Sequence, residues 1–170
     1  MLVVLSGLPG VGKTTIAREL ARATEGVYVR LDSIEHALRN AGLHVEGEGY
    51  RVAYSIAEDN LRLGRVVVAD CVNPWPLTRS EWRSVANRVG VPVVDVEIVC
   101  SDADEHRRRV ESRRTDIPGH RLPTWAEVVE RDYREWNGGR LVIDTARLTV
   151  EQSVRTILTA VRSTDDFPGS

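Results

Sequence analysis

The sequence predicts an α/β fold in which a parallel β-sheet carries helices on both faces. Five short apolar segments, at residues 2–5, 27–31, 65–70, 93–99 and 141–144, alternate with longer segments of helical periodicity. Strands buried on both faces of a parallel sheet are expected to be almost continuously apolar, as these are. No repeat or linker interrupts the 170 residues, and this length suits one domain. We therefore expect residues 1–170 to form a single domain.

Composition and charge restrict the classes of partner. The net charge is −2, so no overall positive charge recruits nucleic acid, and nucleic-acid binding is not expected. No apolar run is long enough to span a membrane, and the chain enters its first strand without the pattern of a signal peptide. Cys71 and Cys100 lack metal-ligand spacing and follow apolar strands. We expect buried, reduced thiols in a cytoplasmic protein.

The glycine-rich stretch from Gly7 to Thr14 fits the Walker A pattern G-x-x-x-x-G-K-[ST]. A strand precedes it and a helix follows at 15–22, so backbone N–H groups and the helix N-terminus can converge on phosphate oxygens. Lys13 is expected to reach the β- and γ-phosphates, and Thr14 to ligate Mg²⁺. The pattern predicts ATP and Mg²⁺ as cofactors. The predicted nucleotide-binding residues of the loop are Pro9, Gly10, Val11, Gly12, Lys13, Thr14 and Thr15.

Capping signals divide the rest of the chain into elements. Asp32-Ser33 is a candidate N-cap for a helix over 34–40, and a second helix is expected over 50–63. Capping boxes begin at Thr78 and Thr124, and Asp102 starts a helix that runs to Ser112. The second capping box is expected to open a helix with one apolar face. That face would consist of Trp125, Val128, Val129 and Trp136.

Sites in parallel α/β sheets lie at the carboxyl ends of the strands, so the residues after each strand are the candidates. Asp32, after the second strand, is positioned to accept a proton from a hydroxyl that attacks the γ-phosphate, and it is also a candidate to contact the acceptor. The alternative is a plain helix N-cap. Asp70 ends an apolar run of the Walker B type and is expected to hold Mg²⁺. The alternative there is a turn residue at the strand end.

Five arginines lie within residues 107–114. Arg109 and Arg113 share a helix face and suit phosphoryl oxygens, so we expect both to bind nucleotide from an arginine-rich lid at about 107–123, with Arg113 catalytic. For Arg107 and Arg108 we expect a solvated face paired with acids.

Three further strand ends carry weaker candidates. Asn73 and Trp75 follow the third strand, where they are expected to wall an acceptor pocket, although Trp75 can equally pack on the next helix. Asp144 and Thr145 follow the fifth strand and are expected near the nucleobase. The histidines show no ligand spacing and receive no role.

Together these motifs resemble the small P-loop kinases of the nucleoside-monophosphate-kinase-like class over essentially the full length. The expected fold is therefore a three-layer P-loop NTPase fold with five parallel strands in the order 2-3-1-4-5. Chloramphenicol phosphotransferase and polynucleotide 5′-hydroxyl kinase are two similar families. In both, an Asp after the second strand is the general base, and that position is Asp32 here.

Residues 29–35, Val-Arg-Leu-Asp-Ser-Ile-Glu, look more like the chloramphenicol phosphotransferases. Polynucleotide kinases carry Asp-x-x-Arg, whereas Glu35 occupies the arginine position here. The resemblance implies ATP-dependent phosphorylation of a hydroxyl on a small molecule that it does not name. A nucleotide or polynucleotide kinase and a slowly hydrolysing ATPase switch or adaptor remain alternatives. No guanine-specifying motif is present, and the sequence leaves the oligomeric state open.

Overall fold

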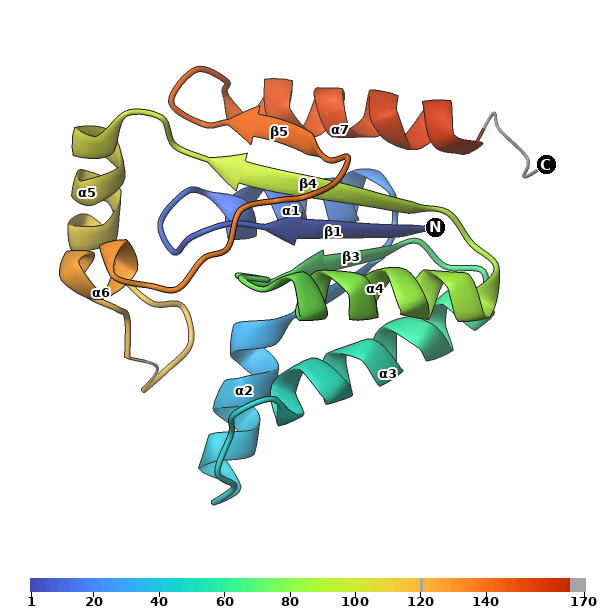
Figure 1. Cartoon of the computed structure of the whole chain (residues 1–170), viewed down its shortest axis with the longest axis horizontal. Coiled ribbons are helices and arrows are strands. Elements are labelled where there is room, and N and C mark those ends of the chain that lie inside the picture. Colours follow the sequence, from blue (N-terminus) through green and yellow to red (C-terminus); the bar gives the residue numbers. More distant parts are fainter. Residues whose placement is uncertain (120, 166–170) are drawn as a thin grey trace.

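The computed structural model describes residues 1–119 and 121–165 and shows a five-stranded sheet between two helical layers (Figure 1). The strand order is β2-β3-β1-β4-β5, and neighbouring strands are parallel throughout. The predicted fold class and strand order are therefore confirmed. The strands are β1 (Leu2–Ser6), β2 (Val27–Arg30), β3 (Val67–Asp70), β4 (Val93–Val99) and β5 (Leu141–Asp144).

The helices fill the connections between these strands. They are α1 (Lys13–Ala23), α2 (Leu31–Asn40), α3 (Glu48–Arg62), α4 (Pro76–Val89), α5 (Ala103–Ser112), α6 (Trp125–Val129) and α7 (Val150–Asp165). None of the helices in the described ranges has the length and apolar character needed to cross a membrane.

Two apolar layers hold the helices against the sheet, and β1 shows how the strand sequence divides between them. Val3 and Leu5 pack with α1 and α7, whereas Leu2 and Val4 pack with α3 and α4. All four side chains are fully buried. The continuous apolar run of β1 thus reflects burial on both faces of the sheet.

Helix boundaries differ from the predicted ones in three places. The α2 helix begins at Leu31, directly after β2, with Arg30 as an N-cap that makes no side-chain capping bond. The α4 helix begins at Pro76, two residues before the predicted capping box, because proline is well suited to the first helical turn. The capping box at Thr124 is confirmed, but α6 ends at Val129, so Trp136 is not on its face.

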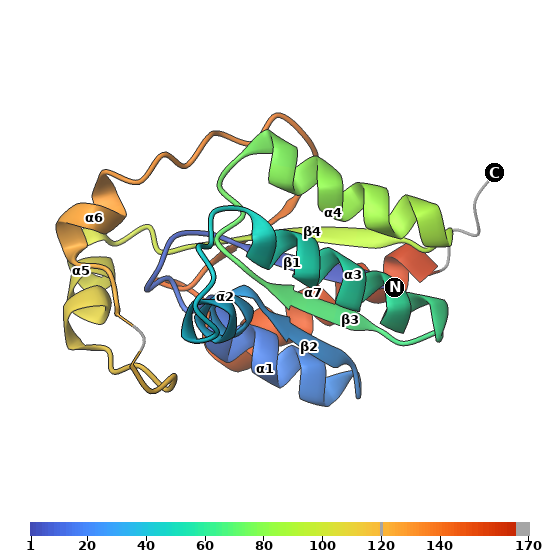
Figure 2. The same ribbon diagram turned by 90° about the horizontal axis from the view of Figure 1, so that it is seen from below.

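The carboxyl ends of the strands point toward one side of the molecule, where α5 and α6 lie (Figure 1). The view from below shows that α2 also lies toward this edge (Figure 2). Two connections that are far apart in the sequence, one with α2 and one with α5 and α6, are thereby brought to the end of the sheet that carries the glycine-rich loop.

Candidate active site

The glycine-rich loop joins β1 to α1 in a conformation that glycine favours. Gly10 and Gly12 have φ angles of 86° and 98°, in the left-handed region. A Cβ atom on Gly10 would lie 2.5 Å from Cγ2 of Val110, so α5 leaves no space for a side chain there. The first turn of α1 receives no side-chain capping bond. Its N–H groups are thus available to phosphate oxygens, and the loop fits the triphosphate of a nucleotide.

Lys13 and Thr14 lie at the base of this loop. The Lys13 ammonium is buried and donates to the Leu8 carbonyl at 2.9 Å. Burial lowers its pKa, while the negative charges of Asp70 and Asp32 act in the opposite direction. A buried ammonium that donates within a phosphate-binding loop is positioned to neutralise phosphoryl charge.

Asp70 lies opposite Thr14. The Thr14 hydroxyl donates to Asp70 Oδ2 at 2.8 Å, and the Tyr28 hydroxyl donates to the same oxygen at 2.8 Å. Burial and the charge of Asp70 raise the pKa of Tyr28, so Tyr28 stays protonated as a donor. Asp70 is therefore oriented toward the magnesium ligand predicted in the loop, and the alternative of a simple turn residue is not favoured.

The Thr14–Asp70 pair fits a magnesium ion that is bound together with nucleotide. Within residues 1–119 and 121–165, no group of three or more His, Cys, Asp or Glu side chains forms a closed metal cluster. Mg²⁺ in kinase sites is held by one or two protein oxygens, with phosphate oxygens and waters completing the octahedron. A hydroxyl and a carboxylate at the end of the P-loop match that donor set.

Asp32 lies in the first turn of α2 rather than at its N-cap. The alternative that its carboxylate merely caps the helix is therefore wrong, because the chain passes from β2 into α2 without a connecting residue. Burial lowers the pKa of the Arg113 guanidinium, and the charge of Asp32 opposes that effect, as it does for Lys13. The negative charge of Asp32 thus acts on both cations.

Arg109 connects α5 to the loop after β5. Its guanidinium donates to Thr145 Oγ1 at 2.8 Å and to the Thr145 carbonyl at 3.1 Å. Thr145 Oγ1 in turn donates to the Val11 carbonyl at 2.8 Å. Two predicted nucleotide-binding residues, Arg109 and Thr145, are therefore in contact with each other and with the P-loop. Asp144 accepts from Ser101 beside them.

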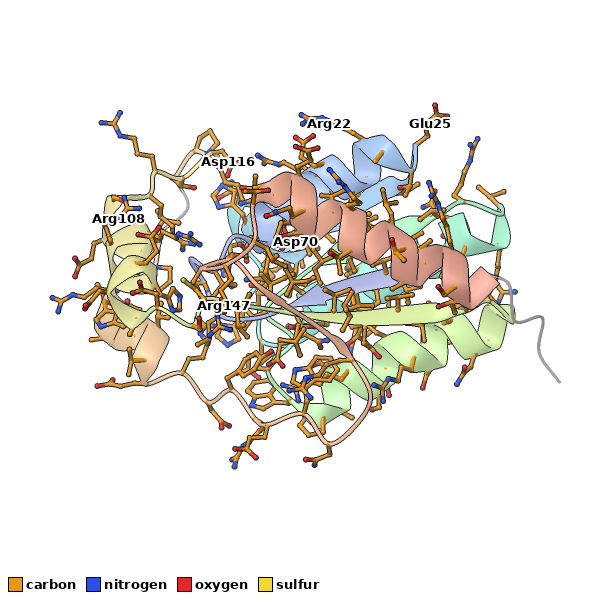
Figure 3. The ribbon with its side chains drawn as sticks, turned by 90° about the horizontal axis from the view of Figure 1, so that it is seen from above. Arg22, Glu25, Asp70, Arg108, Asp116 and Arg147 are labelled. Carbon is orange, nitrogen blue, oxygen red and sulfur yellow. The ribbon has the colours of Figure 1, made fainter. Side chains whose placement is uncertain are left out.

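The other α5 arginines form the solvated face predicted for them. Arg107 pairs with Glu111 at 2.8 Å and Arg108 with Glu105 at 2.7 Å. Arg108 lies on the outer side of α5 (Figure 3). These two arginines are therefore not candidates for the site.

Comparisons with known proteins identify the family and the fold. A family model described as an AAA domain matches residues 2–132. The chain belongs to this AAA domain family. A probable adenylyl-sulfate kinase from Aeropyrum pernix is 25% identical over 173 residues, covering 96% of this chain and 93% of that protein.

Solved structures show the same fold. The Mycobacterium tuberculosis APS kinase in complex with AMPPNP and APS has a TM-score of 0.73 at 19% identity and covers 95% of this chain and 96% of its own. A gluconokinase from Sinorhizobium meliloti has a TM-score of 0.67 at 17% identity, covering 97% of this chain and 94% of its own. At these identities the likeness concerns the fold.

In this AAA domain, His106 of α5 contacts the P-loop, a role that the sequence analysis did not predict. Its Nε2 lies 2.8 Å from the Pro9 carbonyl oxygen, and its buried ring packs edge-to-face on Trp125 at 5.1 Å between centroids. A carbonyl oxygen is only an acceptor, so Nε2 carries a proton in this contact. A histidine that bonds one main-chain carbonyl needs no second ligand residue at a fixed spacing, so no sequence pattern indicates this role.

The acceptor-side candidates divide between the interior and the surface. The Asn73 side chain is 0% exposed and donates to Ser6 Oγ at 3.0 Å, so it supports the loop after β3 from within. Trp75 is 47% exposed, and its indole N–H donates to Asp132 at 3.0 Å. A surface pocket of about 500 Å³ lies beside Trp75 and Asp132. Trp75 therefore remains available to a ligand, whereas Asn73 acts through its neighbours.

Proposed function

We propose that this AAA domain is an ATP-dependent phosphotransferase that transfers the γ-phosphate to a hydroxyl of a small-molecule acceptor. The observation that carries the proposal is the position of Asp32 in the first turn of α2, directly after β2, where its negative charge acts on both Lys13 and Arg113. A switch or adaptor ATPase would need the P-loop but not a carboxylate at this position.

The nucleotide is assigned to the P-loop and the two segments in contact with it. Backbone groups of residues 9–15 bind the phosphates, and Lys13 neutralises the β- and γ-phosphates. Arg109 and Thr145, joined by two hydrogen bonds, and Asp144 beside them form the base-proximal side. Mg²⁺, held by Thr14 and Asp70, supplies charge neutralisation between the phosphates.

The transfer step follows from the positions of three side chains. The acceptor oxygen forms a bond to the γ-phosphorus while the bond to the β–γ bridging oxygen breaks, which yields ADP and a phosphate monoester. Asp32 accepts the proton that the hydroxyl loses. Lys13 and Arg113 stabilise the charge on the transferring group. Arg113 is the C-cap residue that directly follows α5, in an extended conformation. We assign the segment that carries it, at about 107–123, as the arginine-rich lid of a single domain formed by residues 1–170.

The acceptor is proposed to bind between α2 and the loop after β3. Trp75 belongs to that loop, and its exposed indole ring lies beside residues 132–137. Asn73 holds that loop in place through Ser6. The kinases among the similar proteins support an acceptor of small-molecule size, since they include an APS kinase and a gluconokinase.

A polynucleotide 5′-hydroxyl kinase is the less favoured alternative. Glu35, one turn beyond Asp32, pairs with Arg39 at 2.8 Å and presents no cation to a polynucleotide phosphate. The likeness of residues 29–35 to chloramphenicol phosphotransferase favours a small acceptor instead.

A screen of hydroxyl compounds scored by ADP release tests the proposal. We expect ADP release by the Mg²⁺·ATP-loaded protein to rise many-fold with the correct acceptor and to give a phosphate monoester. Equal ADP release with every compound, and no phosphorylated product, would indicate a switch ATPase. Stimulation by oligonucleotide ends that weakens with salt would indicate the polynucleotide alternative.

A further inference from the structure

Arg30 is a nearly buried cation next to the proposed base. It ends β2, directly before the helix that carries Asp32, and it is paired in register with Asp70 of β3. Its side chain is only 12% exposed. Burying an arginine without full hydrogen bonding is costly, so the burial of this guanidinium has to be explained by the groups around it.

The hydrogen bonds of Arg30 are incomplete among the described residues. Nη1 donates to both carboxylate oxygens of Asp116, at 3.0 and 2.9 Å. The buried Nε has no partner in the part of the chain that the structure describes. The Nε of Arg113 is likewise buried without a partner among the described residues. A buried N–H of a charged group without an acceptor is able to donate to an anion.

Asp116, which belongs to a different element, accepts hydrogen bonds from part of the Arg30 guanidinium. It lies in the loop after α5 and faces α1, where it also pairs with Arg18 (Figure 3). Arg18 and Arg30 thus come from the regular framework, while the carboxylate between them comes from a segment without helix or strand. Asp116 binds both arginines as a free carboxylate, sulfate or phosphate group would.

We propose that Arg30 recognises a compact oxyanion on the acceptor, and that Asp116 occupies the same position when no acceptor is bound. This inference rests on the proposed function, which it extends from hydroxyl compounds to hydroxyl compounds carrying a carboxylate, sulfate or phosphate group. The oxyanion takes the Nε and Nη donors of Arg30, with Arg18 at the outer side, and the hydroxyl then faces Asp32.

Arg18 and Asp116 provide matched controls. Arg18 pairs with the same carboxylate but is 40% exposed, and none of its nitrogens is buried without a partner. If Arg30 serves only to hold the loop through Asp116, then Arg30→Gln, Arg18→Gln and Asp116→Asn will have the same effect. If Arg30 binds an oxyanion, Asp116→Asn will leave binding equal or tighter, because a competing internal carboxylate has been removed.

Sulfate is a probe that needs no knowledge of the acceptor. With the P-loop filled by Mg²⁺·AMPPNP and ionic strength held constant with NaCl, we expect millimolar sulfate to raise the melting temperature of the wild type and of Asp116→Asn. Arg30→Gln is expected to lose this shift while keeping its affinity for AMPPNP. An equal shift in all variants, or no shift in any of them, would overturn the proposal.

Matched acceptor pairs distinguish this inference from the proposed function. For pairs such as gluconate and glucose, we expect ADP release to favour the anionic member. Arg30→Gln should raise the KM for that member by about tenfold to hundredfold, in line with a lost hydrogen bond to a charged group. Equal turnover of a neutral acceptor would overturn the oxyanion site while the kinase assignment stands. Absence of transfer to any acceptor would contradict the proposed function, and the sulfate measurement would still decide the site.

Discussion

The two segments that meet at the candidate active site are held in place by different kinds of contact. The glycine-rich loop contributes main-chain groups to its contacts, since Gly7 donates its N–H to the Val72 carbonyl at 3.1 Å and the Leu8 carbonyl accepts from the Lys13 side chain. The segment from Ala103 to Gly119, here the α5 segment, is fixed through side chains, among them His106 and Asp116. Main-chain groups are retained in most substitutions, whereas each side-chain group can be removed by a single substitution.

This difference separates the two halves of the proposed reaction. The loop provides phosphate binding that depends on backbone geometry, so its shape should be independent of acceptor and pH. The α5 segment provides Arg113 and encloses the site through ion pairs, so its position should respond to both. Substitutions in the two segments therefore test the comparison directly.

The largest effect is expected from Lys13→Ala. Lys13 is buried against phosphate-binding backbone and packs no apolar core, so its removal should abolish phosphoryl transfer while the protein stays folded. Product formation and circular dichroism check this. Arg22→Ala, on the exposed side of the same helix, is the control and should behave as wild type. A folded Lys13→Ala protein with near-normal turnover would refute the role of the loop.

Arg113→Ala is expected to act on catalysis more than on binding. The Nε of Arg113 is buried without a partner among the described residues, and we expect it to gain one when charge develops on the transferring phosphoryl group. We expect kcat to fall by about 10²-fold, with a smaller rise in the KM for ATP. The exposed neighbour Arg114→Ala serves as the control. An unchanged kcat with a raised KM would restrict Arg113 to ground-state binding of ATP.

His106→Phe should weaken the contact between the α5 segment and the loop. The substitution keeps an aromatic ring beside Trp125 but leaves the Pro9 carbonyl without its donor. We expect a loss of about 1–2 kcal/mol in unfolding free energy and a severalfold higher KM for ATP. Arg108→Gln, on the outer side of α5, should change neither quantity. Equal behaviour of the two variants in denaturant melts and kinetics would show that the contact is unimportant.

The smallest effect is expected from Asp116, whose side chain is 45% exposed. Hydrogen bonding from Arg18, and secondarily from Arg30, lowers the pKa of Asp116 to about 2. Because its pKa in the unfolded chain is about 3.9, the ion pairs stabilise the fold above that pH, and their contribution declines as the pH falls toward 2.

The difference in unfolding free energy between the wild type and Asp116→Asn should therefore be largest above pH 5, at about 0.2–1 kcal/mol, and shrink below pH 4. Urea melts at several pH values measure it. A difference that grows on acidification would have the wrong sign for a carboxylate with a lowered pKa.

The glycine-rich loop was predictable because its signal is local, whereas the strand order was predicted from the resemblance to P-loop kinases. Gly7 to Thr14, with a strand before and a helix after, carry the whole Walker A pattern within eight consecutive residues. The double-sided burial of β1 was equally visible as an uninterrupted apolar run. By contrast, the N-terminus of α2 was misplaced, because a strand that passes directly into a helix leaves no turn residues to mark the boundary.

The contacts of the α5 segment were not predictable from sequence patterns. Asp116 meets Arg18 across 98 residues, and His106 meets Pro9 across 97, so neither pair produces any spacing signal. Alternation along β2 did place Tyr28 and Arg30 on one face, which was the available hint that Arg30 approaches the site. Asn73 was predicted to line the acceptor pocket. Its side chain is fully buried, and its amide N–H donates to Ser6 Oγ.

The measurement that tests the central claim most directly compares Asp32→Asn with wild type on the acceptor that the screen identifies. The substitution keeps the shape of the side chain and removes its basicity. Glu35→Gln, the next acid of α2 and the partner of Arg39, is the matched control. We predict that Asp32→Asn lowers acceptor-dependent kcat by about 10²–10⁴-fold, with ATP affinity and melting temperature nearly unchanged. Wild-type turnover by Asp32→Asn would contradict the assignment of Asp32 as the general base.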